Sequence, residues 1–202
     1  ASGITIDANT IHDVLDVAIR FNGIGAAVTC NVTNNLIHTI GSPGTGFLSG
    51  LAIDHIGVGV VTGNQISGVT GGLGVGIQAS GTTLVSGNSI TAVAGGNGIT
   101  FPGSGILTNL SGTAVTDNYL FGNAIGVTVA EPAPGFVSGV TVNGNCIAGN
   151  TTGLVDAITG VVDAENNWWG EVDGPSEGGG TGATGSGDTI VSSTGGVPDF
   201  TP

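Results

Sequence analysis

The stretch Val140-Thr-Val-Asn-Gly-Asn-Cys-Ile-Ala-Gly-Asn150 contains a short frame that recurs along the whole chain. Val142 stands three positions before Asn145, and Ile147 stands two positions after it. This frame, apolar-x-x-Asn-x-apolar, occurs seven times in 202 residues, with successive asparagines 22 to 30 residues apart. A self-similar unit of this length is typical of a solenoid, in which each repeat forms one coil. The seven asparagines are Asn9, Asn35, Asn64, Asn88, Asn118, Asn145 and Asn167.

The spacing within the frame predicts strands that meet at a corner. Side chains two positions apart share one face of a strand, whereas the two apolar positions of the frame are five apart. The asparagine is therefore expected at a bend, because it tolerates left-handed backbone and can bond its own backbone. Asparagines at equal positions on successive coils can also bond one another in a ladder. A second frame, as in Gly50–Ile53 and Gly74–Ile77, adds a further strand, so we expect an all-β parallel solenoid of about seven coils.

The end of the repeats carries a more specific signal. Asp163-Ala-Glu-Asn-Asn-Trp-Trp-Gly170 is followed by Gly174-Pro175 and by a final Asp199-Phe-Thr-Pro202. With the repeats, these motifs resemble the right-handed parallel β-helix (pectate-lyase-like) superfamily, and in particular its secreted members that end in a Trp-Trp-Gly motif. The resemblance implies a single-stranded right-handed β-helix and secretion to the cell exterior or surface. It does not imply an activity, because the superfamily includes lyases, hydrolases, adhesins and structural proteins.

Domain organisation follows from the same repeats. Residues 1–170 are expected to form the coils, and residues 171–202 a glycine-rich loop and a C-terminal strand or tail that closes or extends the solenoid. Residues 41–50 and 102–113 contain proline or Gly-Ser clusters and are expected to be loops. Thr10–Phe21 is also compatible with an amphipathic helix, but the repeat register at Asn9 favours strands.

Charge is scarce and almost all of it is negative. The net charge is −13, charged residues make up 7% of the chain, and Arg20 is its one strong cation. This balance excludes binding driven by nucleic-acid phosphates and attraction to anionic membranes. It also disfavours a site for polyanionic sugars. A surface of Thr, Ser, Asn and Gly is expected where a protein packs against copies of itself or carries glycans.

The remaining motifs give weak candidate sites. Trp168 and Trp169 are expected to plug the end of the core, with Trp169 the better candidate because neighbouring residues of a strand point to opposite faces. Oxygen ligands make Asp173 and Glu177 weak candidates for calcium, although ordinary solvated carboxylates are favoured, and no other cofactor is implied. Three N-glycosylation sequons are present, although an Asn- and Thr-rich chain creates sequons by chance. They begin at Asn31, Asn109 and Asn150.

The histidines and cysteines do not provide a strong candidate site. His12 and His38 occupy the same position of adjacent coils and should stack about 5 Å apart. No third metal ligand is evident, so a solvated or interface pair is favoured over a metal site. Cys30 and Cys146 lie four coils apart, too far for a disulfide within the chain, so free thiols are favoured and a bridge between molecules is the alternative.

No complete lyase or glycosidase site emerges, since no two acids occupy equivalent positions on adjacent coils. The favoured hypothesis is a non-catalytic extracellular structural protein that self-assembles, as the subunit of a filament or surface layer, with itself as partner. One alternative is a carbohydrate-binding or carbohydrate-cleaving module of a larger secreted protein. The other is a segment of a phage or virus fibre.

Overall fold

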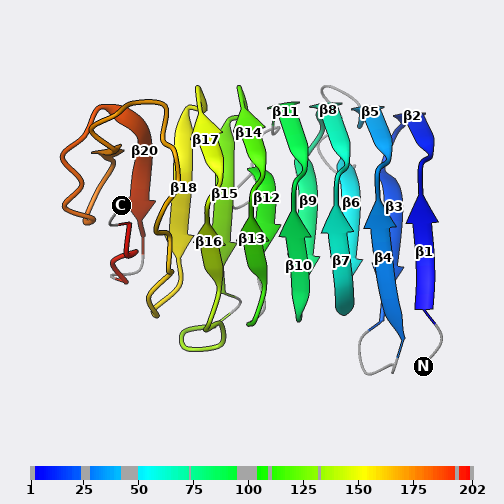
Figure 1. The fold of residues 1–202 in the computed structure, drawn as a ribbon, viewed down its shortest axis with the longest axis horizontal. Helices are drawn as coiled ribbons and strands as arrows, with labels where there is room; N and C mark the ends of the chain where they lie inside the picture. The colour runs from blue at the N-terminus through cyan, green and yellow to red at the C-terminus, as the bar shows by residue number, and fades with distance from the viewer. Residues whose placement is uncertain are drawn as a thin grey trace.

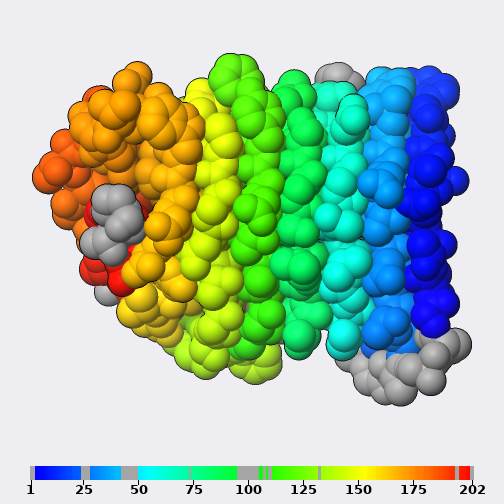
Figure 2. Space-filling view, viewed as in Figure 1, coloured from blue at the N-terminus to red at the C-terminus, as the bar shows by residue number. Residues whose placement is uncertain are grey.

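The computed structural model is a parallel β-solenoid whose strands stack along the long axis of the molecule (Figure 1). It describes residues 3–23, 28–41, 50–72, 74–94, 104–108, 111–131, 133–193 and 196–200. The described residues contain strands and turns but no helix, so Thr10–Phe21 is not helical and contributes to strands β2 (Thr10–Val14) and β3 (Val17–Asn22). The colour order in Figure 2 follows the coils from one end of the molecule to the other.

Every coil contributes one strand to each of three sheets, and all pairings are parallel. Sheet A contains β1 (Gly3–Asp7), β4 (Thr29–Thr33), β7 (Val58–Thr62), β10 (Thr83–Ser86), β13 (Ala114–Thr116) and β16 (Thr141–Asn143). Sheet B contains β2 (Thr10–Val14), β5 (Leu36–Ile40), β8 (Gln65–Val69), β11 (Ser89–Val93), β14 (Tyr119–Phe121) and β17 (Cys146–Ala148). Sheet C contains β3 (Val17–Asn22), β6 (Leu51–Ile56), β9 (Val75–Ser80), β12 (Ser104–Thr108), β15 (Ile125–Ala130), β18 (Thr152–Ala157), β20 (Gly187–Ser192) and β19 (Pro175–Glu177).

The number of coils is lower than the sequence predicts. Sheets A and B hold six strands each, so five turns carry the chain from β1 to β16. The seventh repeat, around Asn167, forms isolated bridges from Asp163 to Thr141 and from Trp168 to Cys146 rather than strands. Seven coils was therefore too many, because the frame around Asn167 is followed by the C-terminal segment and not by another coil.

The core consists of columns of aliphatic side chains that point into the solenoid. β-Branched residues fit these positions because they pack well on a pleated surface. Burying each of these side chains stabilises the folded state by about 1.5 to 3 kcal/mol. The column of sheet A is Val32, Val61, Val85, Val115 and Val142. The column of sheet B is Ile37, Ile66, Ile90, Leu120 and Ile147. The column of sheet C is Ile53, Ile77, Ile106, Val127, Leu154 and Ile190.

One predicted loop contains a strand. Within 102–113, β12 pairs with β9 and β15, and Ile106 lies opposite Ile77 and Val127. The glycine at position 105 explains this, since a Cβ there would lie 2.8 Å from the carbonyl oxygen of Gly126. A glycine that indicates a loop in the sequence is thus a close backbone approach inside a strand.

Candidate functional site

An asparagine ladder runs along one corner of the solenoid, between sheets A and B. The backbone N–H and the side-chain amide of Asn35 both donate to Oδ1 of Asn64, at 3.0 and 2.9 Å. The amide of Asn64 also donates to the carbonyl oxygen of Val32 in the preceding coil, at 3.0 Å. Each of the five internal ladder asparagines, Asn35 to Asn145, thus accepts at Oδ1 from the ladder asparagine before it and donates to Oδ1 of the one after it. The ladder comprises Asn9, Asn35, Asn64, Asn88, Asn118, Asn145 and Asn167.

The chain bends because residues on both sides of the ladder adopt left-handed backbone. The residue before each ladder asparagine has a φ between 55° and 69°, and so does the residue four positions after the first six. Glycine, asparagine and aspartate tolerate this region best, and they occupy most of these positions. The first set is Ala8, Asn34, Gly63, Gly87, Asp117, Gly144 and Asn166, and the second is Asp13, Thr39, Gly68, Ala92, Gly122 and Gly149.

A second, shorter ladder lies at the corner between sheets B and C, and sequence reasoning missed it. The backbone N–H and side-chain amide of Asn123 donate to Oδ1 of Asn150, and those of Asn150 donate to a carboxylate oxygen of Asp188. The other carboxylate oxygen of Asp188 accepts from the N–H of Gly149. The available signal was the five-residue spacing of Asn118 to Asn123, repeated from Asn145 to Asn150.

This second ladder excludes one glycosylation candidate. Asn150 is 8% exposed, and its side-chain amide donates to Asp188 and to the carbonyl oxygen of Leu120. A glycan on that nitrogen is incompatible with the folded chain. Asn31 lies in β4 and is half-buried, whereas Asn109 lies outside the described residues.

The two tryptophans at the C-terminal end point to opposite sides of the chain. Trp169 is 3% exposed and belongs to the hydrophobic core. Trp168 is 45% exposed, so it does not contribute to the core plug. Neighbouring residues in extended backbone point to opposite sides, and the bridge from Trp168 to Cys146 places Trp168 on the outer face of sheet B.

The two calcium candidates hold loops in the C-terminal segment. Asp173 accepts from the N–H and the hydroxyl of Ser186, and these bonds lower the pKa of the Asp173 carboxyl. Glu177 accepts from the N–H groups of Gly179 and Thr181, and the pKa of its carboxyl is lowered mainly by the bond from Thr181. Within the described ranges, no three His, Cys, Asp or Glu side chains are placed to hold a metal.

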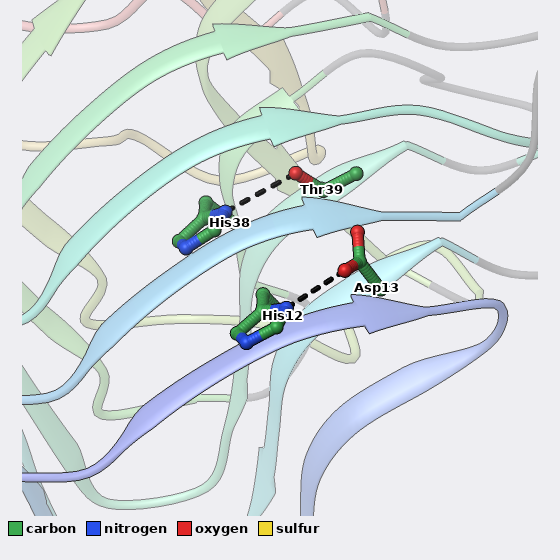
Figure 3. A network of polar contacts seen from close by, with 4 residues as sticks. All are labelled: His12, Asp13, His38 and Thr39. Atoms are coloured by element: carbon green, nitrogen blue, oxygen red, sulfur yellow. Dashed lines mark hydrogen bonds and ion pairs between the residues drawn. The ribbon is translucent and has the colours of Figure 1, made fainter.

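The two histidines stack on the outer face of sheet B (Figure 3). The rings of His12 and His38 are 5.2 Å apart between centroids and inclined by 7°. Nδ1 of His12 lies 2.8 Å from a carboxylate oxygen of Asp13, and Nδ1 of His38 lies 3.1 Å from the hydroxyl of Thr39. Asp13 and Thr39 are the left-handed corner residues that follow the histidines, so the fold itself brings these four side chains together.

Both cysteines are free thiols. Cys30 is buried in the core and Cys146 is half-buried on the outer face of sheet B. Desolvation raises the pKa of both thiols, which keeps them protonated and weakly reactive.

Two ionisable side chains point into the solenoid from sheet C. The His55 ring donates from Nε2 to the carbonyl oxygen of Cys30 at 3.0 Å, and its Nδ1 accepts from the hydroxyl of Thr83 at 3.1 Å. Burial lowers the pKa of His55, which favours the neutral form of the ring. Burial also raises the pKa of Asp156 to about 6. One Asp156 oxygen accepts from the N–H of Ile158, and the other has no hydrogen-bond partner among the described residues.

Arg20, the one strong cation, lies on the outer face of sheet C. Nε of Arg20 donates to a carboxylate oxygen of Asp54 at 2.9 Å. Asp54 is buried, whereas more than half of the Arg20 side chain is exposed. Arg20 therefore compensates a buried carboxylate in a neighbouring coil.

Comparison with protein-family models matches residues 1–168 to the family described as the right-handed beta helix region. The chain belongs to this family. No curated protein and no solved structure matched the chain. Membership in the β-helix family accounts for the three parallel sheets and the stacked coils, and it leaves the activity open because fold and function are separable. No helix in the described part of the β-helix is long and apolar enough to cross a membrane.

Proposed function

We propose that the protein is a non-catalytic structural protein of the cell exterior that assembles with copies of itself through its first coil. The observation that carries this proposal is the incomplete burial of that coil. The extracellular location rests on the resemblance to secreted β-helices and on the low content of charged residues, 7%.

The edges of all three sheets coincide at the first coil. β1, β2 and β3 end their sheets, and in the described part of the chain each pairs with one neighbour, β4, β5 and β6 respectively. Their other sides face away from the solenoid. An edge strand with free N–H and C=O groups is a template for a strand of another chain.

Apolar side chains at this end are also incompletely buried. In the second coil, Cys30 and Ile37 are fully buried in the core. Their counterparts in the first coil are Ile4, which is 45% exposed, and Ile11, which is only partly buried. A further coil laid on this end would bury them, and Oδ1 of Asn9 could then accept in the way the later ladder asparagines do.

The opposite end offers a poorer edge. There β20 and the three-residue β19 extend sheet C past β18, and β19 begins with Pro175, which cannot donate to a ladder. Because the first coil offers the better edge, we expect association to begin with a dimer in which two first coils pair about a two-fold axis. A filament or surface layer would then require a second contact.

Sedimentation of the purified chain over a range of concentrations tests the proposal. We expect a reversible dimer or larger assembly that Ile4→Lys shifts toward monomer, because a lysine on an edge strand opposes pairing. Leu84→Lys is the matched control, since Leu84 is similarly exposed but lies on a central strand of sheet A. A wild-type chain that stays monomeric at the highest attainable concentration would refute the proposal, and a trimer would favour the fibre alternative.

A further inference from the structure

Exposed aromatic side chains gather on the outer face of sheet B in its last coils. Tyr119 and Phe121 of β14 are 45% and 47% exposed, and their rings are stacked with centroids 6.0 Å apart. Tyr119 lies opposite Cys146, which in turn lies opposite Trp168, so these three residues form one column along the solenoid axis. The same column carries Thr10, Leu36, Gln65 and Ser89 in the earlier coils. The aromatic surface is therefore a local feature of the C-terminal end.

Two hollows adjoin this surface. One, of about 530 Å³, lies beside Phe121 and is lined by the small residues Ala148, Gly149 and Gly170. A Cβ on Gly149 would lie 2.7 Å from the Phe121 ring, so the small residue keeps this side open. The other hollow, of about 340 Å³, is lined by Trp168 and Val172. Both volumes lie in the range of small-ligand sites.

Most polar groups in the hollows are carboxylates and hydroxyls, and the amides of Asn150 and Asn167 complete the polar lining. Glu171 and Trp169 line both hollows, so the two hollows meet at these residues. Asp173 lines the smaller hollow, and Ser176 and Thr189 line the larger one. No cationic side chain lines either hollow. This part of the surface therefore repels anions, while its aromatic faces and oxygen acceptors suit a ligand with apolar ring faces and many hydroxyl donors.

We propose that the exposed aromatic surface of Tyr119, Phe121 and Trp168, together with the two hollows that meet at Glu171, binds an uncharged, extended β-1,4-linked oligosaccharide. Tyr119 and Trp168 are separated by two strand spacings, about 9.5 Å, and point to the same side of the sheet. Alternate sugars of an extended chain present the same face, so the two aromatic rings stack on alternate sugars. Glu171 accepts hydrogen bonds from sugar hydroxyls. The saccharide runs along the solenoid axis, and the site is independent of the first coil.

The test uses the full chain and three uncharged probes, cellohexaose, chitohexaose and mannohexaose, with hexagalacturonate as the anionic comparison. Binding is measured by calorimetry and by tryptophan fluorescence. We expect saturable binding of at least one uncharged probe and none of hexagalacturonate. Trp168→Ala and Tyr119→Ala should each weaken binding by roughly tenfold, as expected for loss of an aromatic anchor.

Leu36→Ala is the matched control, because Leu36 is exposed in the same column, at the other end of sheet B. It should leave binding unchanged, and thermal unfolding of each variant verifies the fold. Failure of all three uncharged probes to bind, or binding that neither aromatic substitution weakens, would overturn the proposal. A change in sedimentation caused by Trp168→Ala, without saccharide binding, would instead assign this surface to contact between copies. Ile4→Lys should alter assembly and leave saccharide binding intact, so the two proposals can fail separately.

Discussion

Replacing the buried Asp156 by asparagine should stabilise the protein at neutral pH. Asp156 is fully buried, one of its oxygens has no hydrogen-bond partner among the described residues, and Glu131 adds a like charge to the cost of burial. The asparagine is nearly isosteric, and its Oδ1 can still accept from the N–H of Ile158. The substitution therefore removes a buried charge and retains the local turn.

The expected magnitude follows from the pKa. The Asp156 carboxyl has a pKa of about 6 in the folded chain against an ordinary value of 3.8, a difference of about 3 kcal/mol at 1.36 kcal/mol per pKa unit. Below pH 3.8 the group is protonated in both states and costs nothing. Between pH 3.8 and 6 the unfolded chain releases its proton and the folded chain keeps it, so stability falls as pH rises. Above pH 6 the full loss of about 3 kcal/mol persists.

Urea unfolding of the wild type and Asp156→Asn between pH 3 and 8 measures this effect as a difference curve. The variant should gain up to about 3 kcal/mol at pH 7.5, or roughly 6 to 12 °C in Tm, and nothing at pH 3. Asp188→Asn is the control of opposite sign, because Asp188 accepts from Gly149 and Asn150 and its amide would face those donors. If Asp156→Asn were neutral or destabilising at pH 7.5, the interpretation of Asp156 as an uncompensated charge would be refuted.

Three further predictions concern buried polar groups. Asn64→Ala should lower the free energy of unfolding by about 3 kcal/mol or more, because the N–H of Asn35 and the carbonyl oxygens of Val32 and Thr62 lose their partner. Asn9→Ala, at the exposed end of the ladder, should cost under about 1 kcal/mol, and chemical denaturation compares the two variants. The His55 ring should remain neutral in NMR titrations at pH 6.5, and its lowered pKa should make stability fall as pH drops below 6.5; a ring protonated at pH 6.5 would contradict the assigned hydrogen bonds. Arg20→Ala should lower the free energy of unfolding by about 1 to 2 kcal/mol, because it leaves Asp54 buried without its cation. Adding Asp54→Asn to this variant should recover most of that loss, and a double-mutant cycle measures the coupling between the two residues.

The sequence predicts the fold because each coil repeats the same local chemistry. The frame around Asn145 places an amide at a bend and aliphatic residues on both sides, and the structure forms its ladder and core columns from those positions. The family match confirms the right-handed β-helix. Strand β12 was missed because Gly105 also fits a loop, and only its parallel neighbours show that the glycine allows close approach.

The candidate site was less predictable because its residues come together through register rather than through a motif. The second ladder occupies only the last coils, and Asp188 lies 38 residues after Asn150, its partner. The column from Tyr119 to Trp168 depends on the number of residues in each coil, which varies along this chain. Trp168 and Trp169 are neighbours in sequence, and only the strand face decides that one contributes to the core and the other to the surface.

The direction of the asparagine ladder has a consequence for how such a chain can change its length. Every internal coil presents an acceptor on one side and donors on the other, so each is a modular unit that can follow any other. An in-frame duplication of residues 65–88, which span one repeat from Asn64 to Asn88, would reproduce the ladder bonds at both junctions. The second ladder ends at Asp188, whose carboxylate accepts hydrogen bonds but has no N–H to donate to a further coil. Coils can therefore be added to this ladder only before Asp188. Related proteins are therefore expected to differ by whole coils inserted before the C-terminal segment.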